Sequence, residues 1–271
     1  MKDITKITIL SGLFISVLYF GTFKWLIGAW TNNSYYSHGF LVLGVSVFVA
    51  WTKRGEFKVE PYKNGLALIV IGLILYIIGF IELFPFLSAI SFLFTLSGLV
   101  LYLYGKDTMR ALAFPISFLI FAIPLPFLIN IASVLQTISA KYSAMIIEIL
   151  GIQFTRIGSE IHLQNSSFVI GLPCSGMNTL ISLLTLSTIF IYILSCPTYK
   201  KVILFCITVP IAIFSNILRI TMILSIANTY GAEVAIRFFH DFSSLFVYII
   251  AFICLIIIGK LMGCNIKKSK P

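Results

Sequence analysis

The sequence predicts an all-α membrane protein with about eight transmembrane helices, an amphipathic interfacial helix and a small outer β-hairpin. Three observations predict it: the composition, the lengths of the apolar segments and the distribution of charge. Of the 271 residues, 59% are hydrophobic and only 10% are charged, and the mean hydropathy is +1.06. Globular domains average about 25% charged residues. The composition therefore excludes an ordinary cytosolic domain, a disordered chain and a disulfide scaffold.

Eight apolar segments are long enough, or nearly so, to cross a bilayer, which takes about 20 residues. They are residues 7–30, 36–51, 65–81, 83–104, 111–129, 176–194, 202–227 and 242–261. The first follows two lysines, as a signal peptide would, but it is longer than the usual apolar core and no cleavage signature with a soluble domain follows it. We therefore expect it to remain in the protein as an anchor.

Residues 131–150 carry apolar side chains at a nearly helical period. The other face of this helix is polar, with Gln136, Ser139, Lys141 and Glu148. Because charged groups are costly in hydrocarbon, the pattern favours a helix that lies in the membrane interface over one that spans it.

The loop that follows, residues 151–173, predicts a short β-hairpin. Ile161 and Leu163 alternate with polar residues, and a polar turn separates them from Phe168 and Ile170. No other segment suggests a second domain. We therefore expect one membrane-embedded domain over residues 1–271, with residues 131–173 at its outer surface.

The net charge of +10 could indicate nucleic-acid binding, but in so apolar a chain it predicts membrane orientation. If the N-terminus is cytoplasmic and all eight segments span, 14 of the 19 Lys and Arg residues lie inside and the outside carries no net charge. If residues 131–150 also spanned the membrane, Lys200 and Lys201 would lie outside. The excess of basic residues on the inside argues against this arrangement. We therefore expect a multi-pass protein of the cell membrane, with both termini cytoplasmic, lipids around it and no nucleic-acid partner.

Three polar residues stand at the predicted outer boundary. Cys174 opens the sixth segment, Arg219 lies about 26 Å along the seventh, and His240 precedes the eighth. A cysteine near a helix N-terminus can attack a carbonyl as its thiolate, and a histidine can carry the proton. Arginine keeps its charge and can stabilise an oxyanion. Sequence alone does not show that the three side chains meet.

Each of these residues also has an ordinary explanation. A membrane arginine near a helix end usually snorkels, and a boundary histidine is often a surface residue. Membrane cysteines usually fill apolar space, which we expect of Cys196, Cys206, Cys254 and Cys264. On the predicted topology, however, Cys174 is the only outer cysteine, so it is a free thiol where thiols are normally oxidised.

The order of several motifs resembles the exosortase/archaeosortase family of multipass membrane cysteine transpeptidases. The motifs are Tyr36-Ser37-His38-Gly39-Phe40-Leu41, Ile123-Pro124-Leu125-Pro126, Leu135-Gln136, Leu150-Gly151-Ile152, Pro173-Cys174-Ser175-Gly176, Asn216-Ile217-Leu218-Arg219-Ile220 and His240. The resemblance implies a catalytic set of Cys174, Arg219 and His240. It also implies substrates that are exported proteins with a C-terminal motif, a transmembrane helix and a basic cluster. Such an enzyme cleaves the tail, holds the protein as a thioester and transfers it to an acceptor, an unidentified lipid or glycan.

Two features depart from the family pattern. Met177 and Asn178 stand where a Leu-Arg pair is usual, and Arg237, one turn before His240, is an alternative for the third catalytic role. The supporting or substrate-binding residues expected beside the catalytic set are Asn216, Ser175, Gly176, His38 and Arg237. No metal-binding motif is present, so we expect neither a metal nor another cofactor.

Two other functions remain open from the sequence. Arg219 could bind an anionic solute in a multipass transporter, or the protein could be a non-catalytic assembly factor of polysaccharide export. A transporter predicts internal repeats and broken helices near the midplane. The absence of a visible repeat and the gathering of polar residues at one face favour a cysteine protease or transpeptidase.

Overall fold

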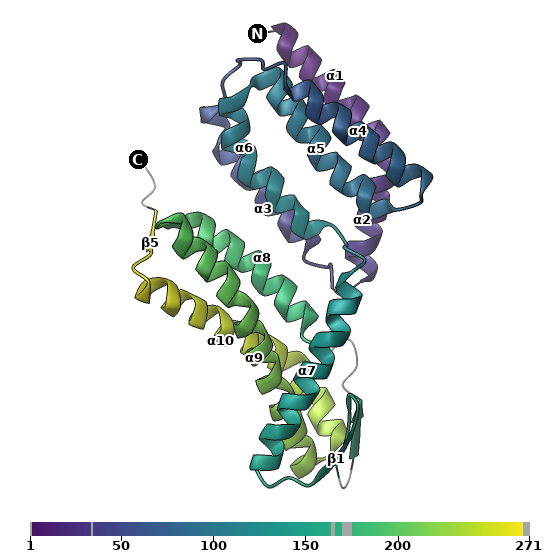
Figure 1. The fold of residues 1–271 in the computed structure, drawn as a ribbon, viewed down its shortest axis with the longest axis vertical. Coiled ribbons are helices and arrows are strands. Elements are labelled where there is room, and N and C mark those ends of the chain that lie inside the picture. Colours follow the sequence, from purple (N-terminus) through teal and green to yellow (C-terminus); the bar gives the residue numbers. More distant parts are fainter. Residues whose placement is uncertain (1, 34, 164–165, 170–174, 268–271) are drawn as a thin grey trace. The chain divides into compact units, whose positions relative to one another are not determined.

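The computed structural model describes residues 2–33, 35–163, 166–169 and 175–267, and side chains in these ranges except at 2, 3, 5, 129, 166–169 and 236–245. The chain forms two compact units, Met1–Pro126 and Phe127–Pro271. The described residues of the first unit form helices and the loops between them, with no strands. Its elements in chain order are α1 (Lys2–Leu18), α2 (Phe20–Asn32), α3 (Gly39–Thr52), η1 (Arg54–Glu56), α4 (Gly65–Ile81), α5 (Pro85–Tyr104), α6 (Lys106–Phe118) and η2 (Leu119–Ala122) (Figure 1).

Glycines allow α4 and α5 to pack closely. Gly65, Gly72 and Gly79 recur every seven residues on one face of α4, and all three are buried. A Cβ at Gly72 would lie 2.7 Å from the backbone nitrogen of Thr95, and one at Gly79 would lie 2.8 Å from that of Ser88. Small residues at such an interface let helix backbones approach, as is usual between membrane helices.

The first predicted span, residues 7–30, is not one straight helix. It consists of α1 and α2, which are bent by 64° at Tyr19. No proline causes the bend; instead the Tyr19 hydroxyl hydrogen-bonds with Ser91 (3.0 Å) and Thr95 (2.9 Å) of α5. Tyr76 of α4 donates its hydroxyl to the Leu18 carbonyl at 2.8 Å. Contacts with distant helices therefore stabilise a bend that the local sequence does not predict.

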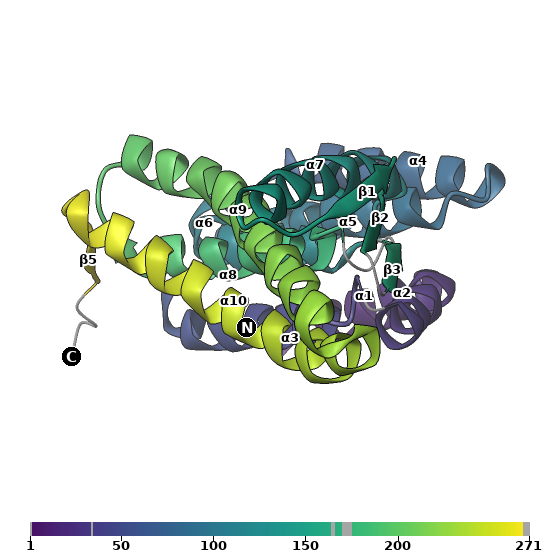
Figure 2. The same cartoon turned by 90° about the horizontal axis from the view of Figure 1, so that it is seen from below.

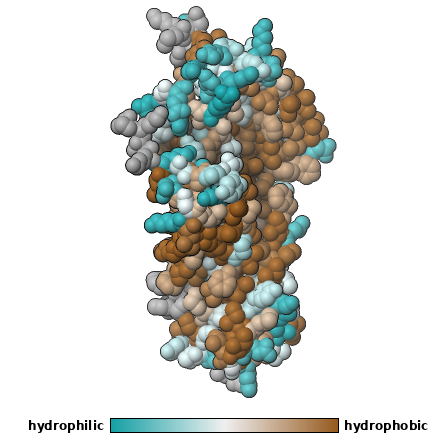
Figure 3. Space-filling view, turned by 60° about the vertical axis from the view of Figure 1, so that its left-hand side comes forward, coloured by the Kyte–Doolittle hydropathy of each residue, from teal (hydrophilic) through white to brown (hydrophobic). Residues whose placement is uncertain are grey.

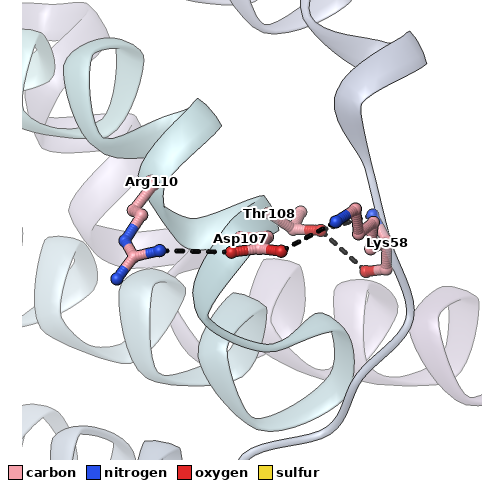
Figure 4. Close-up of polar contacts among 4 residues, drawn as sticks. All are labelled: Lys58, Asp107, Thr108 and Arg110. Carbon is pink, nitrogen blue, oxygen red and sulfur yellow. Dashed lines mark hydrogen bonds and ion pairs between the residues drawn. The ribbon is translucent and has the colours of Figure 1, made fainter.

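A polar tie joins the loop after η1 to the start of α6 (Figure 4). The Thr108 hydroxyl accepts from the Lys58 backbone N–H at 2.9 Å and donates to the Lys58 carbonyl at 2.7 Å. Asp107 pairs with Lys58 (3.0 Å) and with Arg110 (3.3 Å). The Lys58 ammonium, hydrogen-bonded to Asp107, lowers the pKa of that carboxyl, and the same contact raises the pKa of Lys58.

The second unit combines four helices with two small sheets. The helices are α7 (Leu128–Ile149), α8 (Met177–Ile193), α9 (Thr198–Tyr230) and α10 (Ala232–Leu261). The strands are β1 (Phe154–Ile157), β2 (Glu160–Leu163), β3 (Ser166–Val169), β4 (Leu194–Ser195) and β5 (Asn265–Ile266). The first sheet has the order β1-β2-β3, is antiparallel and lies beside α7 (Figure 2). The second pairs β4 with β5.

The helix and the hairpin expected within residues 131–173 are present. Residues 131–150 lie almost wholly in α7, and β2 with β3 forms the predicted hairpin, to which β1 adds a third strand that the pattern did not predict. The buried side chains of Ile161 and Leu163 pack with α7 and α9 residues in one apolar cluster. The alternation seen in the sequence therefore reflects a real buried face.

The ends of three predicted spans differ from the expectation. Helix α6 begins at Lys106 and its continuation η2 ends at Ala122, because Pro124 and Pro126 follow before α7 starts; the predicted span 111–129 therefore ended too late. Helices α9 and α10 extend beyond the segments 202–227 and 242–261. At 33 residues, α9 is about 50 Å long, well over the roughly 30 Å of a hydrocarbon core.

The surface has the character of a membrane protein. Large hydrophobic side chains lie exposed along nearly every apolar helix, among them Phe14, Val17, Phe48, Phe80, Phe214 and Leu261. Figure 3 shows such side chains over much of the visible surface. Within the described residues, two helices are long and apolar enough to span a membrane, Pro85–Tyr104 and Thr198–Tyr230. The bent pair α1–α2 is a third candidate, and Gly39–Thr52, Gly65–Ile81, Met177–Ile193 and Phe246–Leu261 are shorter apolar helices.

The prediction that Cys196 and Cys264 merely fill apolar space is wrong for this pair. Both lie in an apolar cluster with Phe190 and Leu204, but they also form a disulfide. Their separation of 68 residues hid the pairing, because only the antiparallel hairpin of α9 and α10 brings the ends of α8 and α10 together. Cys206 and Cys254 are free and exposed.

Candidate functional site

The start of α8 is a tight turn built by Ser175 and Gly176. Gly176 has a φ of +84°, a left-handed conformation that favours glycine, and it caps the helix. The Ser175 hydroxyl accepts a hydrogen bond from the Met177 backbone N–H at 3.3 Å, and both residues are buried. Cys174, immediately before this turn, lies outside the described residues. The Ser175–Gly176 turn therefore directly follows the cysteine in the sequence and leads into α8.

Gly176 lies against α9 at Asn216. A Cβ on Gly176 would lie 2.6 Å from Cγ and 2.8 Å from both Cβ and Nδ2 of Asn216. Real Cβ atoms do not approach other atoms this closely, so only glycine fits here. The cysteine motif of α8 and the Asn-Ile-Leu-Arg motif of α9 are therefore in direct contact, although about 40 residues separate them in the sequence.

Asn216 is fixed from its other side by α7. Its Nδ2 donates a hydrogen bond to Ser139 Oγ at 2.9 Å, and Ser143 Oγ donates to the Ile217 carbonyl at 3.1 Å. The exposed fraction of Asn216 is 1%, and both serines are buried. Ser139 belongs to the polar face that the sequence predicted for this helix, and its side chain is buried against a partner helix.

Arg219 lies one turn after Asn216 on the buried side of α9. Only 5% of this residue is exposed. It does not snorkel at a helix end, because α9 continues for 11 residues to Tyr230. Its backbone lies about 32 Å along α9 from Thr198, slightly more than the roughly 30 Å thickness of a hydrocarbon core. A buried charge in such a place is a functional candidate.

His240 and Arg237 lie within α10 rather than before a helix. Helix α10 begins at Ala232, so the backbone of His240 is in its third turn; the side chains of both residues lie outside the described part of the structure. The expectation that His240 precedes the eighth helix is wrong, because α10 starts ten residues before the apolar segment 242–261.

Helices α8 and α10 run parallel, and three contacts fix their relative level. The Tyr248 hydroxyl donates to the Ser182 carbonyl at 3.4 Å, Gly259 faces the ring of Phe190 and β4 pairs with β5. Tyr248 and Ser182 are separated by 66 residues, which is also the separation of His240 and Cys174. Five residues back from this contact, α8 begins at Met177, while α10 continues towards its start at Ala232.

Asn178 is a residue that the sequence reasoning did not include. Its Oδ1 is buried and finds no hydrogen-bond partner in the part of the chain that the structure describes. A buried acceptor without a partner costs free energy, so native proteins rarely retain one without a role. The signal available in the sequence was the polar residue itself, at the second position of an apolar helix and in place of the usual arginine.

His38 belongs to the first unit and has a structural contact there. Its Nε2 donates to the Phe121 carbonyl at 3.0 Å, next to a bond from Trp30 Nε1 to the Ala122 carbonyl at 2.7 Å. The Tyr36 hydroxyl donates to the Leu125 carbonyl at 3.3 Å. These side chains satisfy the carbonyls of the chain that leaves η2. Among the described residues, no three His, Cys, Asp or Glu side chains gather as metal ligands.

Comparison with known protein families gives one match. The model of a family described as transmembrane exosortase matches residues 30–257, which is most of the chain and includes every candidate site residue. No curated protein and no solved structure matches the chain.

Proposed function

The chain belongs to the transmembrane exosortase family, and on that premise we propose that it is a membrane cysteine transpeptidase. Its substrates are exported proteins whose C-terminal tail carries a short motif, a transmembrane helix and a basic cluster. The enzyme removes the tail and transfers the remaining protein to a lipid or glycan acceptor.

The reaction divides into two acyl transfers. The Cys174 thiolate attacks the scissile carbonyl, and the charge that develops on its oxygen is stabilised by the Arg219 guanidinium. When the peptide C–N bond breaks, His240 gives a proton to the leaving amine, and the protein remains as a thioester. A nucleophilic group of the acceptor then attacks the thioester, gives its proton to His240 and releases the thiolate. Arg237 is the alternative proton-carrying or charge-stabilising residue at this level of α10.

The contact of Gly176 with Asn216 is the observation that carries the proposal. Cys174 is two residues from Gly176, and Arg219 is one helical turn from Asn216. The contact therefore brings the neighbourhood of the nucleophile and the buried guanidinium to the same part of the unit. Burial favours this role, since a guanidinium shielded from water interacts more strongly with a developing oxyanion than an exposed one does.

The proposed topology rests on the positive-inside bias, and it places the Cys196–Cys264 disulfide at the cytoplasmic end, where disulfides are uncommon. We propose that both termini are cytoplasmic and that Cys174, Arg219 and His240 act at the extracytoplasmic face. The outer part of α9, with α7 and the three-stranded sheet packed on it, then projects from the membrane above the reacting groups. A substrate tail that spans the membrane would present the segment next to its helix at this same height.

The test is tail removal from a co-expressed substrate protein of the described architecture. Wild-type protein is expected to shorten the substrate, and Cys174→Ala is expected to leave it full length. Cys206→Ala and Cys254→Ala are matched controls, because both are free thiols on apolar helices, and both variants are expected to process normally. Processing by Cys174→Ala at the wild-type rate would overturn the nucleophile assignment. If the substrate stayed full length with the wild-type protein and with every variant, the result would instead favour a non-catalytic function.

A second test addresses topology. In a Cys206→Ala/Cys254→Ala background, Cys174 is the one thiol left beside the Cys196–Cys264 disulfide. A membrane-impermeant maleimide is expected to label it in intact cells. Labelling only after the cells are opened would contradict the proposed orientation.

A further inference from the structure

We infer that the ends of α8, α9 and α10 form a binding site for the headgroup of an anionic phospholipid. The site is a lysine cluster defined by position: Lys200 and Lys201 in the first turn of α9, Lys260 in the last turn of α10, and Lys267 after α10. It lies at the opposite end of these helices from the candidate catalytic residues, so the inference does not depend on the proposed transpeptidase reaction.

The chain after α10 is fastened to the end of α8. The Cys196–Cys264 disulfide joins the α8–α9 connection to this tail, and β5 pairs with β4 directly beside it. The Lys267 backbone N–H donates to the Ile193 carbonyl at 2.8 Å. The tail is thus held in one place across the ends of the helices (Figure 1).

This fastening brings like charges together. Lys267 Nζ donates to the Tyr192 carbonyl at 2.9 Å and lies 5.0 Å from the centroid of the Tyr192 ring. Lys201 stands beside Lys200 in the first turn of α9. Lys200 Nζ donates to the Met262 carbonyl and lies 3.8 Å from the position that a Gly263 Cβ would take.

No aspartate or glutamate of the second unit lies near this cluster in the sequence. The sequence from 161 to 232 and from 242 to the end contains no Asp or Glu. Asp241, the acidic residue of α10 nearest to the cluster, precedes Lys260 by 19 residues, which is about 28 Å of helix. Backbone carbonyls bind two of the ammonium groups but carry no charge to offset theirs.

The side chains around the lysine cluster favour a lipid phosphate as the anion that binds it. Exposed apolar side chains border the cluster, namely Ile193, Tyr199, Val202 and Leu261. Such residues contact acyl chains, while tyrosines such as Tyr192 and Tyr199 are typical of the membrane interface. Lysines at the end of apolar helices attract the anionic lipids of a cytoplasmic leaflet. A soluble anion would pair with the lysine ammonium groups but would not contact the exposed apolar side chains beside them. We therefore propose an anionic phospholipid such as phosphatidylglycerol.

The experiment measures retained lipid on the full-length protein in neutral detergent by native mass spectrometry. Wild-type protein with equal phosphatidylglycerol and phosphatidylcholine is expected to retain phosphatidylglycerol preferentially. In Lys201→Gln/Lys267→Gln, the ratio of retained phosphatidylglycerol to phosphatidylcholine is expected to fall about fivefold for each lysine removed. The charge-preserving Lys201→Arg/Lys267→Arg is expected to keep it.

A matched control removes two exposed basic residues from the other end of the same unit. Lys141→Gln/Arg156→Gln lowers the net charge equally and is expected to retain the wild-type preference. Cys196→Ser/Cys264→Ser is expected to weaken retention, because the tail that carries Lys267 loses its covalent attachment. An unchanged preference in the Lys201/Lys267 variant, or an equal loss in the control, would overturn the site.

Discussion

The backbone of Gly176 lies against the side chain of Asn216, so closely that a methyl group on the glycine would come within 2.6 Å of Cγ. The contact joins two motifs from different helices. It depends on two properties of one residue, the absence of a side chain and a left-handed φ of +84°. Each property can be tested separately.

Gly176→Ala is expected to destabilise the protein and to abolish tail removal, because the new Cβ would force α8 away from α9. Gly151→Ala is the matched control: its φ is +77°, but nothing lies within 4 Å of its Cβ position. The control is expected to cost only about 1–2 kcal/mol for the left-handed backbone. The measurement is thermal unfolding in detergent alongside tail removal. Equal losses in the two variants would show that the contact with Asn216 is not important.

Arg219 is expected to tolerate no replacement that removes its charge. Arg219→Ala should reduce tail removal by about 100-fold or more, which is typical of the loss of an oxyanion-stabilising group. Arg219→Lys keeps the charge but loses the planar fork, so an intermediate rate is expected. Arg156→Ala, at an exposed position on β1, serves as the control and should process normally. The rate is measured at saturating substrate, so that a change in kcat is seen directly.

The buried oxygen of Asn178 is expected to accept a hydrogen bond from a backbone N–H of the bound substrate. Asn178→Ala should then raise KM with a smaller effect on kcat, since the acceptor acts in binding. Asn178→Asp keeps an oxygen at the same place and should restore part of the affinity. Asn228→Ala, at the exposed end of α9, is the control. A lower kcat with an altered pH profile and an unchanged KM would contradict a role in substrate binding.

The tie between Lys58 and α6 is expected to depend more on Thr108 than on Asp107. Thr108 is 1% exposed, and Thr108→Val leaves the Lys58 N–H and carbonyl without their partner, which should cost about 1–3 kcal/mol in unfolding free energy. Asp107 and Lys58 are exposed, so Asp107→Asn should have a much smaller effect at neutral pH. Unfolding measurements of both variants provide the comparison.

The same tie gives a pH dependence of known sign. Because the Lys58 ammonium lowers the pKa of Asp107, the carboxylate stabilises the folded state above its ordinary pKa of 3.8. This contribution is lost as the pH falls through the lower folded-state value. The wild-type protein should therefore lose slightly more stability than Asp107→Asn on acidification below pH 4. An identical acid response in both proteins would contradict the ion pair.

Much of the fold follows from local pattern. Apolar length predicts the helices, and the amphipathic residues 131–150 form α7 almost as expected. Strict alternation at Ile161 and Leu163 predicts a strand whose buried face the structure confirms. These features are local because each depends on side chains within one or two turns, or on neighbouring residues of one strand.

The candidate site was predictable only in part. Cys174, Arg219 and His240 were chosen because polar residues are costly near apolar segments, and Arg219 is indeed buried. Asn178 was not identified as a candidate site residue, because the sequence does not show whether a side-chain amide has a hydrogen-bond partner. The role of Ser139 was not predicted for the same reason. Its hydrogen-bond partner, Asn216, lies 77 positions away in the sequence.

The sequence by itself determined that this chain is an apolar, helical membrane protein with a net positive charge, because these properties depend on which residue types are present and how they are spaced along the chain. Only the tertiary structure decided the bend at Tyr19, the Cys196–Cys264 disulfide and the contact of Gly176 with Asn216. Each of these requires two helices to meet at a particular register. Lipid solvates any apolar face equally well, so helix register is set by small residues, hydrogen bonds and close packing rather than by hydrophobicity.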